Sequence, residues 1–297
     1  MEGLLIIERN LREHIESHLK SMGLMFKIFS RIKDLDSIKE KVERKNYKEN
    51  GRKITDIIGF RVTLYFEDDV SFAFKYFKEK FEVFDDKYDP TPPTVFEPIR
   101  KNLTCYMDKE YTKILSEVCS GTYDSVISSF ISNTYEIQFR TTLSEGWHEV
   151  EHNMRYKCKD EWVGLDHEGR MLNGIYAALE SHDHFLLKLF EDLSYSHYKN
   201  CNWEAMIRNK FRLRFQLKSL NEEIGKILSE NQALARKLFK IRRPDLLEKV
   251  CYVGMKMPMT IDGLVYLCNH LFLKDEKLFT ITPSVLKEDF VFYFSSN

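Results

Sequence analysis

Residues 135–141, Tyr-Glu-Ile-Gln-Phe-Arg-Thr, combine an acid, an amide and a base at alternate positions. Apolar residues at 135, 137 and 139 separate Glu136, Gln138 and Arg140, and a period of two is typical of a half-buried strand. The three polar side chains therefore share one face. On that face Glu136 could accept a proton or bind a metal ion, with the amide and the guanidinium orienting the groups around it.

A second carboxylate, Asp56, stands near the start of the apolar run 54–66. That run predicts an interior strand, because its residues are too apolar for an exposed sheet edge. An aspartate before a strand is often only a turn residue. Beside Glu136 on a neighbouring strand, however, Asp56 would complete a carboxylate pair suited to Mg²⁺, which prefers one or two carboxylates plus substrate phosphates.

Basic residues are concentrated between Lys27 and Lys53, where ten Lys and Arg accompany five Asp and Glu. We expect a strand over residues 24–33 and then a helix, capped by Asp34 or Asp36, to about residue 47. This arrangement would direct several cations at one polyanion. The alternative is an ordinary solvated, charged helix face.

Three motifs, in this order, resemble the synthetase domain of the RelA/SpoT family. They are Arg31-x-Lys33-x₃-Ser37-x₃-Lys41, the segment 55–62 (TDIIGFRV), and 136–141 (EIQFRT) followed by a helix that ends in Tyr-Lys at 156–157. Members of this family transfer pyrophosphate from ATP to the 3′-hydroxyl of a guanosine nucleotide. The resemblance covers roughly residues 25–157, and the rest of the chain resembles no family.

The resemblance implies a role for each matching residue. Glu136 and Asp56 would bind Mg²⁺, and Glu136 would also take the proton of the acceptor hydroxyl. The implied catalytic residues are Glu136, Asp56, Gln138 and Arg140; the implied ATP-binding residues are Arg31, Lys33, Ser37, Lys41 and Arg61; Tyr123 would stack on the acceptor base, and His152 and Lys157 would complete the site.

The sequence departs from the family at the acceptor loop. The family pattern Gly-Tyr-Arg-Ser-x-His is replaced here by residues 122–127, Thr-Tyr-Asp-Ser-Val-Ile. An anion at Asp124 weakens the attraction for a phosphorylated acceptor. Synthesis of a guanine-nucleotide alarmone, as in the stringent response, is the first hypothesis. The alternatives are a toxin-like transfer to the 3′ end of tRNA and a catalytically silent relative that binds a nucleotide or RNA.

Two histidine motifs have competing interpretations. His148 to His152 satisfies the HExxH pattern of zinc peptidases, but an acid inside the motif and the lack of an evident third ligand argue against zinc. The pair His182-Asp183 is similar to the His-Asp pair of the RelA/SpoT hydrolase domain. Because the pair lies within a helical run rich in Leu and Phe, we expect it at the surface.

Composition places few further limits on function. Of 297 residues, 43% are hydrophobic and the formal net charge is −1, which is typical of a globular protein without a global charge signal for nucleic acid or membrane. Six cysteines without a CxxC pair favour reduced thiols. We therefore expect a cytoplasmic protein with no membrane segment.

We predict an α+β fold with two domains. Residues 1–160 would form a mixed β-sheet flanked by helices, a nucleotidyltransferase-like synthetase domain, with an amphipathic helix over residues 1–22. Residues 120–127 would open a further strand, which would turn in a hairpin into residues 135–141. Residues 161–297 would form an all-α domain of unknown role, with one long helix over 203–239. That domain could support a homo-oligomer or bind a protein partner.

Overall fold

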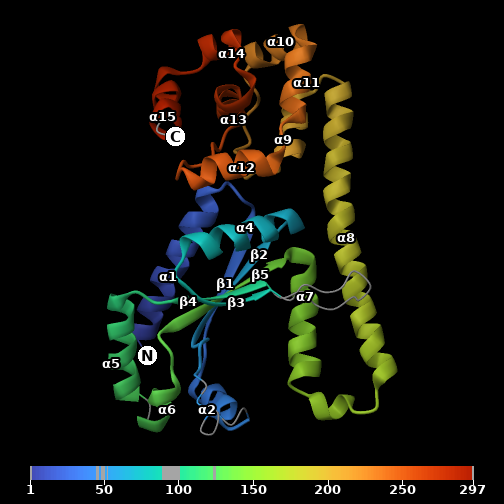
Figure 1. Cartoon of the computed structure of the whole chain (residues 1–297). Helices are drawn as coiled ribbons and strands as arrows, with labels where there is room; N and C mark the ends of the chain where they lie inside the picture. Colours follow the sequence, from blue (N-terminus) through green and yellow to red (C-terminus); the bar gives the residue numbers. More distant parts are fainter. Residues whose placement is uncertain are drawn as a thin grey trace. The chain divides into compact units, whose positions relative to one another are not determined.

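The computed structural model describes residues 2–44, 47, 51, 53–88, 101–122 and 125–295. These residues divide into two compact units (Figure 1). The first unit comprises Met1–Glu16 and Phe26–His184, and the second comprises Ser17–Met25 and Phe185–Asn297. The predicted domain boundary near residue 160 stays a prediction.

The first unit is built on a five-stranded mixed sheet in the order β1-β2-β5-β4-β3. The strands are β1 (Phe26–Ile32), β2 (Ile58–Leu64), β3 (Val83–Tyr88), β4 (Lys101–Tyr106) and β5 (Thr134–Thr141). β2 and β5 are parallel, and the other neighbouring strands are antiparallel. The predicted α+β class is confirmed, and β2 is the interior strand that its apolar run predicts.

The described helices of this unit flank the sheet. They are α1 (Glu2–Ser21), α2 (Leu35–Arg44), α4 (Glu67–Lys80), α5 (Lys109–Thr122), α6 (Ser125–Phe130), α7 (Thr142–Glu151) with its π-helical continuation η1 (His152–Tyr156), the short 3₁₀ segment η2 (Lys159–Trp162), and α8 (Asp166–Lys199). The division between the units falls within α1 and α8. The predicted first helix is confirmed, because its periodic apolar residues are at most 5% exposed.

β5 separates an apolar face from a polar face. Tyr135 and Phe139 are buried, and the Phe139 ring centroid lies 5.4 Å from that of Phe77 on α4. α4 crosses this side of the sheet (Figure 1). The alternate residues Glu136, Gln138 and Arg140 are therefore directed away from α4, as their period of two predicts.

The strand predicted at residues 120–127 is wrong. α5 continues to Thr122, and α6 occupies 125–130. The Ser128 hydroxyl donates to the Cys119 carbonyl over 3.1 Å, and Ile127 is buried. Residues 125–130 therefore pack as a helix against α5, and in place of the predicted hairpin the described residues 125–134 lead from α6 into β5. The antiparallel partner of β5 is β4, which the sequence pattern did not predict, and its parallel partner is β2.

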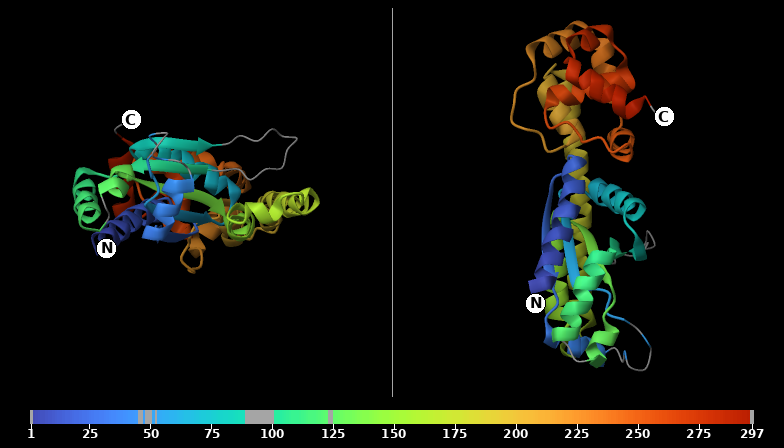
Figure 2. Two further views of the ribbon diagram at one scale, coloured as in Figure 1. Left: turned by 90° about the horizontal axis from the view of Figure 1, so that it is seen from below. Right: turned by 90° about the vertical axis from the view of Figure 1, so that its left-hand side faces the viewer.

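The second unit consists of helices only (Figure 2). Beyond the ends of α1 and α8 these are α9 (Trp203–Phe211), α10 (Glu222–Glu230), α11 (Gln232–Lys240), α12 (Arg243–Tyr252), α13 (Ile261–Cys268) with the π-helical η3 (Asn269–Leu273), α14 (Glu276–Ile281) and α15 (Ser284–Phe294). α13 forms the core, since its apolar residues are at most 6% exposed. Among the described helices, none combines the length and the apolar composition that crossing a membrane requires.

The single helix predicted over 203–239 is also wrong. Arg212 adopts a left-handed conformation with φ of 45°, which ends α9. The side chains of Asn221 and Asn231 then accept hydrogen bonds from the Glu223 and Leu234 amides, over 2.8 and 3.0 Å. Asparagine is favoured at such N-cap positions, so the apolar periodicity runs through three separate helices.

Candidate functional site

The polar face of β5 holds Glu136 between two neutral amides. Gln138 donates from Nε2 to Glu136 Oε2 over 2.8 Å, and Asn102 of β4 donates from Nδ2 to Glu136 Oε1 over 3.1 Å. Arg140 donates in turn to Gln138 Oε1 over 3.1 Å. Within the described part of the chain, no cation forms an ion pair with Glu136. The carboxylate is therefore oriented without being neutralised, which leaves it able to accept a proton or a metal ion.

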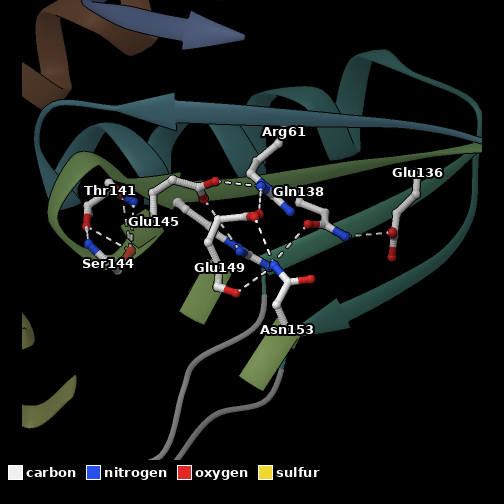
Figure 3. A network of polar contacts seen from close by, with 9 residues as sticks. Arg61, Glu136, Gln138, Thr141, Ser144, Glu145, Glu149 and Asn153 are labelled. Atoms are coloured by element: carbon white, nitrogen blue, oxygen red, sulfur yellow. Dashed lines mark hydrogen bonds and ion pairs between the residues drawn. The ribbon is translucent and has the colours of Figure 1, made fainter. Parts of the chain in front are cut away.

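Two acids of α7 bind the cations next to this carboxylate (Figure 3). Arg61 lies opposite Gln138 in the β2–β5 register. Its Nη1 donates to Glu145 Oε1 over 2.7 Å and also to Glu149 Oε1. The other Glu145 oxygen lies 3.5 Å from Arg140 Nη1. Burial, and next the charge of Arg61, lower the pKa of Arg140. An incoming phosphate would therefore compete with these carboxylates.

The two acids differ in how firmly they are held. The Glu149 side chain is 46% exposed; among the described residues its ion pair is with Arg61, and it also accepts from Asn153 Nδ2 over 3.4 Å. The Glu145 side chain is 15% exposed and bridges both arginines. Ion pairs exposed to solvent contribute little. Glu149 is therefore the carboxylate that a ligand would displace at the lower cost.

A capping box fixes the junction between β5 and α7. Thr141 Oγ1 accepts from the Ser144 amide over 3.1 Å, and Ser144 Oγ accepts from the Thr141 amide over 3.2 Å. Thr141 also donates to Asp183 Oδ2 over 2.6 Å. The expectation that Asp183 lies at the surface is wrong, because this residue is 4% exposed. Its burial raises the pKa of Asp183 to about 6.

A second cluster joins three of the predicted site residues. Lys33, directly after β1, and Lys41, on α2, each donate to one Asp56 oxygen over 2.7 Å. Burial alone would raise the pKa of Asp56, but the two lysine charges and hydrogen bonds outweigh it and lower the pKa to about 2. Burial lowers the pKa of Lys33. Asp56 thus holds both lysines in place through ion pairs with their ammonium groups.

Arg31 and Ser37 lie beside this cluster but make other contacts. Asp34 caps α2 by accepting from the Ser37 amide and from the Ser37 hydroxyl, each over 2.8 Å. Arg31 Nη2 lies 3.6 Å from Asp34 Oδ2, and its side chain is 60% exposed. The predicted cap at Asp34 is confirmed. The Arg31 guanidinium is accessible to a ligand, while the Ser37 hydroxyl serves the helix end.

His152 and Lys157 lie on and just after the π-helical turn η1. The His152 ring stacks on Tyr156 with centroids 5.6 Å apart, and Lys157 donates to Asn153 Oδ1 over 3.0 Å. Burial, then the Lys157 charge, lower the pKa of His152, and the charge of Arg31 acts in the same direction. Arg31 and His152 are thus close enough to interact electrostatically.

The HExxH pattern receives no support as a zinc site. His148 is buried against Trp147 and Tyr176, with ring centroids 5.3 and 5.8 Å away. The described residues contain no group of three or more His, Cys, Asp or Glu side chains that could hold a metal ion.

Two positions of the predicted acceptor loop fall outside the part of the chain that the structure describes. Tyr123, predicted to stack on the acceptor base, and Asp124 lie outside the described residues. Ile127, which takes the place of the family's histidine, is 8% exposed on α6. It therefore contributes to the packing of α6 rather than to a polar surface.

Sequence reasoning missed three residues of the site: Asn102, Glu145 and Glu149. Asn102 was missed because β4 was not predicted. The two glutamates stand four residues apart on α7, the helix that directly follows β5, so they share one helix face. This spacing could have predicted a pair of acids on one helix face that form ion pairs with the arginines of the sheet.

Residues 30–161 match the model of the region found in RelA and SpoT proteins. No curated protein sequence matches the chain at a significant level. Among solved structures, a GTP pyrophosphokinase family protein from Streptococcus pneumoniae is 19% identical, over 64% of this chain and 89% of that one, with a TM-score of 0.44. Small alarmone synthetase 1 from Bacillus subtilis is 21% identical, over 63% and 94%, with a TM-score of 0.42. The structure of the same synthetase bound to its product pppGpp is 21% identical, over 63% of this chain and 95% of that one, with a TM-score of 0.42.

Proposed function

Since residues 30–161 belong to the region shared by RelA and SpoT proteins, we propose that the chain is an ATP-dependent pyrophosphokinase whose acceptor is the 3′-hydroxyl of a guanine nucleotide. The observation that carries the proposal is the state of Glu136. Its carboxylate is held by two amides, is not neutralised by a cation of the described residues, and lies next to the arginines of β2 and β5.

The reaction requires a proton acceptor beside the attacking hydroxyl. Glu136 takes this proton while the hydroxyl oxygen attacks the β-phosphorus of ATP. The bond from the β-phosphorus to the oxygen bridging the α- and β-phosphates breaks, AMP leaves, and the pyrophosphoryl group passes to the acceptor. The amides of Gln138 and Asn102 orient the carboxylate for this transfer.

The cations of the site would bind the donor phosphates. Lys33 and Lys41 lie together on Asp56, and Arg61 lies on β2 beside the catalytic strand. A polyphosphate gains charge-assisted hydrogen bonds from such groups. Binding would exchange the Asp56 and Glu149 contacts of these cations for contacts with phosphate oxygens.

The donor set fits Mg²⁺ at Glu136 better than at Asp56. Glu136 forms no ion pair within the described chain, although the Arg140 charge acts on it from beyond Gln138, whereas both oxygens of Asp56 accept from lysines. Mg²⁺ is commonly held by one or two carboxylates, substrate phosphates and water. Glu136 would therefore be its primary protein ligand, joined by Asp56 once phosphates engage the lysines. A bound Mg²⁺ would neutralise charge on the transferred group.

Two alternatives concern the acceptor and the activity. Asp124 and Ile127 replace the arginine and histidine of the family's acceptor loop, which favours an acceptor held by contacts outside that loop, such as the 3′ end of tRNA. The same loss is compatible with a silent relative. The oriented, unneutralised Glu136 argues for an active enzyme.

The test is transfer of label from γ-labelled ATP in the presence of Mg²⁺. Parallel reactions would contain GTP, GDP, ATP alone or bulk tRNA. We expect labelled guanosine tetra- or pentaphosphate. Label in tRNA without a labelled nucleotide would identify tRNA, rather than a guanine nucleotide, as the acceptor. No label in any reaction would favour the silent relative.

The Glu136→Gln variant tests the catalytic assignment. We expect it to lose transfer while remaining folded, because glutamine preserves the shape but not the basicity of the side chain. Glu117→Gln makes the same change at an exposed position of α5 and should retain activity. Transfer by Glu136→Gln at a near wild-type rate would contradict the role of Glu136.

A further inference from the structure

The second unit contains an open basic hollow where α11 meets α12. Its volume is about 340 Å³, and three cations, Lys237, Lys240 and Arg242, line it together with Phe272 and the acid Asp245. The volume is at the lower end of the roughly 300–1,000 Å³ of small-ligand pockets. The hollow is therefore large enough for a short piece of an extended ligand.

The cations of this basic hollow are available for binding. Lys237 and Lys240 are exposed, and neither makes an ion pair or hydrogen bond within the described chain. Arg242 is 75% exposed, and its ion pair among the described residues is a long contact of 3.8 Å with Asp245. By contrast, the exposed Lys226 and Lys277 of the same unit both pair with Glu230, over 3.9 and 3.8 Å.

Charge is distributed unevenly along the chain. Residues 185–297 contain 18 Lys and Arg against 13 Asp and Glu, although the whole chain has a net charge of −1. A difference of this kind between two parts of a chain indicates a polyanionic partner for the basic part. The segment 236–243 alone has five basic residues and no acid. Arg243 is buried and donates to the Phe211 carbonyl, whereas Lys237, Lys240 and Arg242 line the hollow.

We propose that the basic hollow binds the backbone of single-stranded RNA. Phosphates would contact the lysines Lys237 and Lys240. The Lys249 ammonium lies over the Phe272 ring, 5.8 Å from its centroid, and an unstacked base would stack on the rest of this partly exposed ring. Asp245 repels phosphate but can accept a hydrogen bond from a ribose 2′-hydroxyl, the group that distinguishes RNA from DNA.

A membrane surface fits the hollow less well. The aliphatic residues that line it, Ile241 and Leu273, are only 7% and 8% exposed. Binding in the membrane interface requires an exposed apolar face beside the cations, and Phe272 is only partly exposed. The hollow thus offers charge and one aromatic ring without an apolar surface to insert.

The experiment is fluorescence anisotropy with a labelled adenylate RNA dodecamer and the full chain. We expect the Lys237→Ala/Lys240→Ala variant to bind about tenfold more weakly at low salt. Each phosphate contact of a single strand makes the slope of log K against log salt more negative by about 0.7. Loss of two contacts should therefore make this slope less steep by about 1.4. Both lysines are exposed, so the variant should unfold at the wild-type temperature.

The matched control is Lys226→Ala/Lys277→Ala, which removes the same charge elsewhere in the unit and should bind the RNA like wild type. A deoxyadenylate DNA dodecamer and anionic vesicles serve as competing ligands. Equal weakening of RNA binding in both variants, binding of the DNA dodecamer as tight as that of the RNA, or binding to the vesicles but not to RNA would overturn the proposal. RNA binding is independent of catalysis, so Glu136→Gln should bind normally; loss of pyrophosphoryl transfer alone would affect only the proposed function.

Discussion

Replacing Glu149 by glutamine tests whether α7 competes with ATP for Arg61. In the structure the Glu149 carboxylate accepts from Arg61 Nη1, the guanidinium that would bind a donor phosphate. Glutamine keeps the shape of the side chain but removes its charge. We therefore expect the KM for ATP to fall and kcat to stay near the wild-type value, because the variant exposes a binding group without altering Glu136.

The exposure of the pair sets the size of the effect. The Arg61 and Glu149 side chains are 29% and 46% exposed, and exposed ion pairs contribute about 0.2–1 kcal/mol. If ATP binding has to break this contact, its removal lowers KM by between about 1.4-fold and about fivefold. The Glu145→Gln variant is not equivalent, because the Glu145 carboxylate of the wild type bridges Arg61 and Arg140 and its side chain is only 15% exposed. We therefore expect Glu145→Gln to lower the stability of the protein.

The assay is the initial rate of pyrophosphoryl transfer at increasing ATP concentrations. Glu151→Gln is the control, since Glu151 lies on the same helix but pairs with Arg155, over 3.4 Å. An unchanged or higher KM in Glu149→Gln, or an equal fall in Glu151→Gln, would refute the competition. A collapse of kcat would show instead that Glu149 takes part in the reaction.

Three further predictions concern the rest of the first unit and the boundary. Asp56→Asn should abolish transfer and lower the free energy of unfolding by about 2 kcal/mol, since the pKa of Asp56 is lowered to about 2 and each pKa unit corresponds to about 1.36 kcal/mol. The wild-type protein should lose this stabilisation as pH falls from about 4 to about 2. Urea unfolding over a pH series would measure both effects. For Asp183 the pH dependence of stability has the opposite direction. Its pKa is raised to about 6 because the folded protein favours the protonated carboxyl, so the free energy of unfolding of the wild type falls as pH rises from about 4 to about 6, by at most about 3 kcal/mol. Asp183→Asn should lack this decline in the same unfolding series, and a parallel decline in both proteins would contradict the role of Asp183. Limited proteolysis should cut first between residues 157 and 168 or within 89–98, and cutting only at the termini would argue against a boundary near residue 160.

Where prediction failed, local pattern was compatible with more than one structure. Residues 120–127 alternate weakly and are rich in Ser and Thr, so packing against α5 decides that 125–130 are helical. The apolar period over 203–239 is genuine, but it continues across the caps at Asn221 and Asn231. Periodicity records which residues face the core, and it does not record where one helix ends and another begins.

The alternating polar row of β5, the amphipathic first helix and the order of the three family motifs could be predicted from the residues in order, because each depends on neighbours along the chain. The partners of the charged groups could not, because they come from distant parts of the chain. Asp56 meets Lys33 and Lys41, and Arg61 meets acids 84 and 88 positions away. Which cations are free and which are neutralised depends on strand pairing and on the packing of α7 against the sheet, and residue spacing along the chain does not encode either.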